Sequence, residues 1–90
     1  MVKVTLKEQE CTGTYKFDRQ IVYTRGMENE FGDLIFKVIA DTYKLIHSLV
    51  KENIADYFQV AVAEFENGKI IKYYIIDDVD HVTFLLPCEY

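Results

Sequence analysis

The feature that most constrains the fold is a long amphipathic segment from Asn29 to about Asn53. With about 100° allotted per residue, its polar side chains fall on one arc of a helix and its apolar side chains fill an arc of about 200°. Acidic residues near its start suit the positive end of a helix dipole, and Asn29 suits the N-cap. The pattern predicts one long helix that the rest of the domain must cover.

The apolar arc is wider than one flat sheet covers, and it divides into two seams. The core seam, predicted to face a sheet, consists of Phe31, Leu34, Ile35, Val38, Thr42, Leu45 and Leu49. The second seam, with the spacing of paired helices, consists of Phe36, Ile39, Tyr43, Ile46 and Val50. Either a strongly curved sheet covers the second seam or a partner does. We predict a partner interface there, extended by Phe65 and Tyr74 on the outer face of a hairpin.

Strands are predicted on both sides of the helix. Apolar and polar residues alternate from Val2 to Leu6, and a second apolar row runs from Tyr15 to Tyr23 after the turn signal Thr12-Gly13. We expect these two strands to form a hairpin. After the helix, a last strand is expected over His81 to Leu86.

The strongest short-range signal is a second hairpin, in which Phe58–Glu66 and Lys69–Ile76 flank Asn67-Gly68. A two-residue loop would pair Val62 with Tyr73. The core face would then carry Phe58, Val60, Val62, Ile71, Tyr73 and Ile75. The whole pattern predicts a single α+β domain over residues 1–90, in the order ββαβββ, with about five antiparallel strands in a curved sheet and the helix across one face.

Charge and composition exclude some functions. The net charge of −5 argues against a nucleic-acid-binding surface. The acidity is concentrated in residues 54–90, where seven acidic and two basic groups favour a partner with a basic surface. Apolar runs are too short for a membrane span, and the alternating pattern from Val2 leads us to expect no signal peptide. Cys11 and Cys88 have no metal-binding spacing. We expect a reduced cytoplasmic protein, located in the host cytoplasm if a virus encodes it. A disulfide between Cys11 and Cys88 is the alternative.

The nearest approach to a chemical site is the group Asp77, Asp78, Asp80 and His81, in which Asp78, Asp80 and His81 are the candidate ligands for a divalent cation. Asp78 and Asp80 share one side of an extended segment and Asp77 does not, and no second cluster of acidic residues and histidine completes a metal-binding motif. A solvated turn between two strands explains these residues better. We therefore expect no cofactor, and a metal-dependent enzyme that uses this cluster is retained only as an alternative.

These observations predict a small acidic, non-enzymatic protein-interaction module. We expect it to be a homodimer and to bind or inhibit another protein, as virus-encoded and immunity-type antagonists do. Seven Tyr and six Phe are a large aromatic supply for this length, and a partner would add the apolar burial that so small a domain lacks. The alternative is a ligand-binding domain, with the ligand held between helix and sheet by Tyr43, Tyr73 and Phe84.

Overall fold

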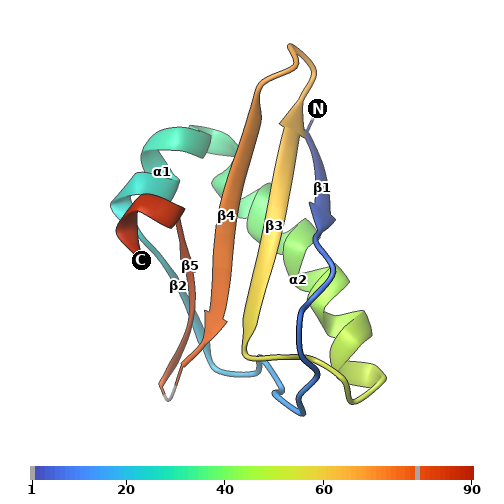
Figure 1. Ribbon diagram of the computed structural model, residues 1–90. Coiled ribbons are helices and arrows are strands. Elements are labelled where there is room, and N and C mark those ends of the chain that lie inside the picture. Colours follow the sequence, from blue (N-terminus) through green and yellow to red (C-terminus); the bar gives the residue numbers. More distant parts are fainter. Residues whose placement is uncertain (1, 79) are drawn as a thin grey trace.

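The computed structural model describes residues 2–78 and 80–90, which form a five-stranded sheet with a long helix packed on one face (Figure 1). The strands are β1 (Val2–Leu6), β2 (Gln20–Tyr23), β3 (Phe58–Phe65), β4 (Ile70–Asp77) and β5 (His81–Leu85), in the spatial order β1-β3-β4-β5-β2. The helical segments are α1 (Arg25–Phe31), η1 (Gly32–Leu34), α2 (Ile35–Lys51) and η2 (Pro87–Glu89). The predicted α+β class and the ββαβββ order are confirmed.

The predicted single helix is split near its start. Helix α1 begins before Asn29 because Thr24 is the N-cap, and its hydroxyl oxygen accepts a hydrogen bond from the Met27 N–H at 3.3 Å. Gly32 then adopts a φ of 53°, a left-handed value that glycine reaches at low cost. The short segment η1 joins α1 to α2 at this point. The expected N-cap at Asn29 is therefore wrong, and the long helix is α2 alone.

The predicted first hairpin is also wrong, because β1 and β2 lie at opposite edges of the sheet (Figure 1). Strand β1 pairs antiparallel with β3, whereas β2 pairs in parallel with β5 and makes the sheet mixed. The connecting residues 7–19 bond to the segment after α2 instead. The Gly13 N–H donates to the Ile54 carbonyl at 3.2 Å, and the Tyr15 N–H donates to the Ala55 carbonyl at 3.1 Å.

The second hairpin is present, but its register differs by one residue from the prediction. Val62 pairs with Lys72 rather than with Tyr73. The loop holds three residues because the Phe65 N–H donates to the Lys69 carbonyl at 2.9 Å and closes the strands there. The Asn-Gly signal therefore located the turn correctly and its length incorrectly.

A shift of one residue reverses both faces of a strand. On β3 the side chains that face the helical layer are Gln59, Ala61, Ala63 and, at the end of the strand, Phe65. The residues expected there but found on the opposite face are Phe58, Val60 and Val62. On β4 the predicted inward residues are correct, namely Ile71, Tyr73 and Ile75. The observed register thus places three large apolar side chains on the open side of the sheet, although the prediction had assigned them to the core.

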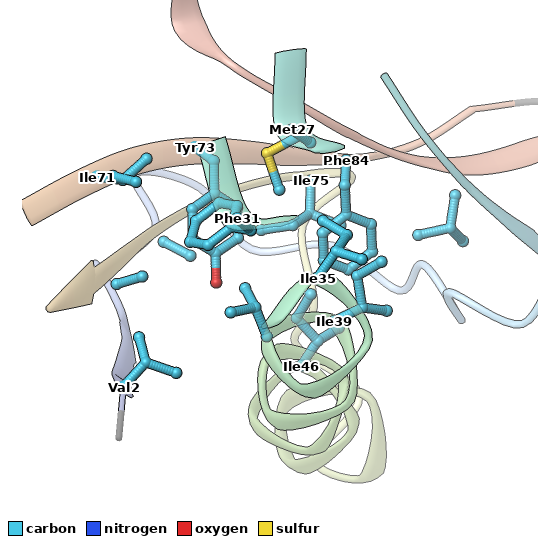
Figure 2. Packing of buried hydrophobic residues seen from close by; sticks show 14 of the residues in the cluster. Val2, Met27, Phe31, Ile35, Ile39, Ile46, Ile71, Tyr73, Ile75 and Phe84 are labelled. Carbon is cyan, nitrogen blue, oxygen red and sulfur yellow. The ribbon is translucent and has the colours of Figure 1, made fainter. Parts of the chain in front are cut away.

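The core lies between the sheet and the helical layer (Figure 2). Helix α2 buries residues from both predicted seams: Ile35, Val38, Ile39, Thr42 and Ile46. From α1, the ring of Phe31 meets that of Tyr73 edge-on, with 5.6 Å between the ring centroids. Burial raises the pKa of Tyr73 to about 12, and its hydroxyl pairs with that of Thr42. One sheet therefore covers much of the wide apolar arc.

Among residues 2–78 and 80–90, no helix combines the length and the apolar character needed to cross a membrane.

Candidate interaction surface

The face of the sheet opposite α2, called the open face, carries a mainly apolar set of side chains. In Figure 1 it lies toward the reader, with α2 behind the sheet and the C-terminal turn η2 at the left, next to α1. Strand alternation directs these residues outward: Phe58, Val60 and Val62 from β3, and Ile70, Lys72, Tyr74 and Ile76 from β4. All seven are half-buried or exposed, so they offer contact area that the core does not use.

Five aromatic rings form a continuous chain that ends on the open face, called the aromatic strip: Tyr15, Tyr57, Phe58, Tyr74 and Tyr90. The centroid distances along it are 5.7 Å from Tyr15 to Tyr57 and 6.2 Å from Tyr57 to Phe58. They continue at 4.9 Å from Phe58 to Tyr74 and 5.8 Å from Tyr74 to Tyr90. These are ordinary separations for interacting rings, so neighbouring rings support one another.

The strip is accessible as well as continuous. Tyr15, Tyr57 and Tyr90 are 45%, 44% and 71% exposed. Tyrosine loses little conformational entropy when it is fixed and offers both an apolar ring and a hydroxyl, which is why it recurs in binding hot spots. Lys72 places its ammonium 5.7 Å from the centroid of Tyr74 and gives the strip a polar border.

Three segments meet at one end of the sheet and form what we call the acidic end: residues 7–19, 52–57 and 77–81 without residue 79. Hydrogen bonds join them, from the Asp77 N–H to the Tyr57 carbonyl at 2.9 Å and from the Asp56 N–H to Gln9 Oε1 at 3.1 Å. Eight acidic and three basic residues lie in these segments. The Tyr15 end of the strip therefore adjoins a negative region, which attracts a basic partner.

Phe17 anchors the acidic end to the core. Its side chain is fully buried, and its backbone has a φ of 51°. Its N–H donates to Asp77 Oδ2 at 3.1 Å, and its carbonyl accepts a hydrogen bond from the Tyr43 hydroxyl. Burial, together with the charges of Asp18 and Asp77, raises the pKa of Tyr43. Tyr43 thus serves to hold this loop in place.

The seven residues predicted as an interface do not lie on one surface. Ile39 and Ile46 are buried against the sheet, and Tyr43, Val50 and Phe65 are half-buried around the core. Phe36 is 69% exposed and meets the ring of Tyr23 edge-on, at 6.0 Å between centroids. Tyr74 lies on the other side of the sheet, within the aromatic strip. Phe36 and Tyr74 therefore belong to two separate surfaces.

Asp78, Asp80 and His81 lie at the turn between β4 and β5 and are exposed. The Asp78 N–H donates to the His81 carbonyl at 2.8 Å, which closes the turn. Within the part of the chain that the structure describes, no three His, Cys, Asp or Glu side chains come close enough together to hold a metal ion.

The residues expected to hold a ligand between helix and sheet make contacts within the protein instead. Tyr73 and Phe84 are fully buried with stacked rings 6.3 Å apart, and Tyr43 is engaged with Phe17. Cys11 and Cys88, the pair considered for a disulfide, are both exposed free thiols.

No protein-family model matches the chain, and no curated protein or solved structure is significantly similar to it.

Sequence reasoning identified Tyr74 as a surface residue but missed the other four members of the strip. Phe58 was assigned to the core because of the register error. Tyr15 and Tyr57 lie outside the strands, where periodicity carries no information about contacts. The sequence gives one weak signal of such a surface. Its aromatic residues, which include Tyr57, Phe58, Tyr74 and Tyr90, are more numerous than a small core needs.

Proposed function

We propose that the protein is a non-enzymatic interaction module that binds another protein through the aromatic strip. The observation that carries this proposal is the unbroken contact of five rings on a surface that the core does not use. Open apolar patches edged by polar groups are typical of protein-binding sites. A module of this kind acts by covering a surface of its partner, as an adaptor or as an inhibitor.

Charge favours a different protein with basic side chains over a second copy of this chain. The acidic end adjoins the strip, and two acidic ends would repel each other if two copies packed strip to strip with these ends together. A homodimer formed elsewhere, for example through Phe36, is compatible with the proposal and is checked by sedimentation. The exposed free thiols of Cys11 and Cys88 agree with a reducing compartment such as the cytoplasm.

Site-directed photo-crosslinking tests the proposal in the cells that produce the protein. A photoreactive residue replaces Val60 on the open face or, as a matched control, His47, which is exposed on α2. We expect a crosslinked heterologous protein from position 60 that is absent from position 47. The adduct should weaken in the Tyr74→Ala/Tyr90→Ala background. Equal crosslinking from both positions, or adducts between copies of the chain alone, would contradict the proposal.

A second candidate function, binding of a small apolar ligand, is favoured by a groove between β1 and the end of α2. Its volume is about 670 Å³, and its apolar lining includes Leu6, Leu45, Leu49 and Ile54. Volumes of this order are typical of ligand sites. A panel of fatty acids and other apolar metabolites should raise the melting temperature of the wild-type protein but not of Leu45→Lys. If no compound does so, this function is excluded for that panel.

A further inference from the structure

A hollow opens at the acidic end of the molecule, next to the first rings of the aromatic strip. Its volume is about 370 Å³, and it is lined by Tyr15, Arg19, Tyr57, Asp77 and Asp78. Two tyrosines and two aspartates therefore line one space. The face of an aromatic ring is negative, as is a carboxylate, so both kinds of residue attract positive charge.

Asp77 is the unusual member of this lining, since only 6% of its side chain is exposed. One carboxylate oxygen, Oδ2, accepts the Phe17 N–H at 3.1 Å. The other, Oδ1, is buried and receives no hydrogen bond from any of the residues that the structure describes. A buried carboxylate loses its hydration and is costly unless a donor or a cation compensates it. The hollow thus contains a charged acceptor atom that is incompletely satisfied.

The chain supplies a cation of its own, but the fit is loose. Arg19 Nε lies 3.8 Å from Asp77 Oδ1, beyond hydrogen-bond distance, and 52% of the arginine side chain is exposed. Well-formed pairs between guanidinium and carboxylate are bidentate, with separations of about 2.8 Å. Arg19 therefore shows which chemistry the hollow attracts without completing the pairing.

We propose that the hollow binds the guanidinium group of an arginine side chain on the partner protein, which displaces Arg19. The arginine would donate to Asp77 Oδ1 and lie against the rings of Tyr15 and Tyr57, 5.7 Å apart at their centroids. The inference rests on the proposed function, because it names one chemical feature of the partner that the aromatic strip receives.

A guanidinium group fits better than the other cations. A metal ion requires several oxygen ligands, and no cluster of three metal-ligating side chains is found in the described ranges. A lysine ammonium is a strongly hydrated point charge. A guanidinium is planar, weakly hydrated and able to stack on a ring while it donates to a carboxylate in its own plane. The two rings beside a buried acceptor match that combination.

The test uses the whole ¹⁵N-labelled protein and the small probe N-acetyl-argininamide, followed by NMR. We expect concentration-dependent shifts of the Tyr57, Asp77 and Asp78 amide signals, and none at Asn67 in the distant β3–β4 loop. The uncharged isostere N-acetyl-citrullinamide should produce no shifts. Arg19→Ala removes the internal competitor and should tighten binding of the probe by roughly threefold to tenfold.

Two charge-matched variants separate a site from general attraction. Asp77→Asn keeps an oxygen that can accept the Phe17 N–H but removes the charge, and should weaken binding of the probe by about tenfold or more. Asp80→Asn removes the same charge from the acidic end outside the hollow and should leave binding within about twofold. Equal weakening by both variants would show that the probe responds to overall charge, and would overturn the proposal.

Absence of shifts in both the wild-type protein and Arg19→Ala would also overturn it, as would equal shifts from the citrulline probe. These two outcomes decide the matter even if Asp77→Asn fails to fold. The titration contains no partner protein, so it is independent of crosslinking at position 60. Crosslinking without probe binding would refute the arginine site alone, and probe binding without crosslinking would refute the role of the strip.

Discussion

In the middle of strand β3, the two faces differ in the size of their side chains more than in their polarity. The face under α2 carries Ala61 and Ala63 there, and the open face carries Val60 and Val62. Ala61 lies between Leu6 on β1 and Tyr73 on β4. The small residues leave room for the large rings of neighbouring strands, which fill the space below the helix. In this sheet, the apolar face of a strand is therefore not automatically its buried face.

The largest difference in stability between the two faces of the sheet is expected for two adjacent tyrosines on β4. Tyr73 is fully buried, so Tyr73→Ala should lower the free energy of unfolding by about 3–5 kcal/mol. Tyr74 is half-buried on the open face, and Tyr74→Ala should cost roughly 1 kcal/mol. Urea denaturation monitored by circular dichroism measures both. Similar losses in the two variants would show that the open face is packed as a second core.

The same comparison explains which parts of the fold the sequence predicted. Periodicity predicted α2 and a segment overlapping every strand, because amphipathic patterns are local. The strand expected from Tyr15 to Tyr23 is confined to Gln20–Tyr23. Periodicity missed the break at Gly32, where a single positive φ angle redirects the chain. It also missed the places of β1 and β2, since pairing with β3 and β5 depends on contacts far apart in the sequence.

The surface was harder to predict than the fold. The Asn67-Gly68 signal is compatible with loops of two or three residues, and that one-residue ambiguity decided which face of β3 is buried. The hollow depends on Arg19, Tyr57 and Asp77, which come from three separate segments. No spacing rule links such residues, so the predicted sites concentrated on the helix, where spacing is informative.

The second prediction concerns the pH dependence that the buried tyrosine introduces. The pKa of Tyr73 is raised from 10.0 to about 12, so the folded state retains a proton that the unfolded state releases. Its contribution to stability is complete below pH 10 and is lost as the pH rises toward about 12, by about 2 kcal/mol. The free energy of unfolding, obtained from urea denaturation at each pH in this range, should fall more steeply with pH for the wild-type protein than for Tyr73→Phe. Parallel curves would contradict the assignment.

The third prediction concerns the effect of a larger side chain on each face of β3. Ala61→Leu adds three carbon atoms below α2 and should cost about 1–3 kcal/mol, because the neighbouring rings must shift. Val60→Leu makes a smaller addition on the open face and should change the free energy of unfolding by about 0.5 kcal/mol or less. Thermal and urea denaturation measure both variants. A tolerated Ala61→Leu would indicate unfilled space under the helix.

The smallest effect is expected at Glu89, which fixes the C-terminal turn η2 beside the open face. Its carboxylate accepts hydrogen bonds from the Thr24 hydroxyl at 2.5 Å and from the N–H groups of Leu86 and Gly26, at 2.9 Å and 3.3 Å. These bonds, the Thr24 bond foremost, lower the pKa of Glu89 below 4.5. The associated stability is therefore present above pH 4.5 and is lost as the pH falls through the lowered pKa.

Because Glu89 is exposed, solvent screens its charge, and Glu89→Gln should move the urea midpoint by an amount near the detection limit at neutral pH. In the acid range, the free energy of unfolding of Glu89→Gln should depend less steeply on pH than that of the wild-type protein. The informative readout is local, because the turn presents Tyr90 to Phe58 at 5.5 Å between ring centroids. NMR cross-peaks between these two rings should weaken in Glu89→Gln and persist in Glu64→Gln, which alters a carboxylate on β3 away from the turn. Unchanged cross-peaks would mean that ring contact, rather than the carboxylate, holds the end of the aromatic strip.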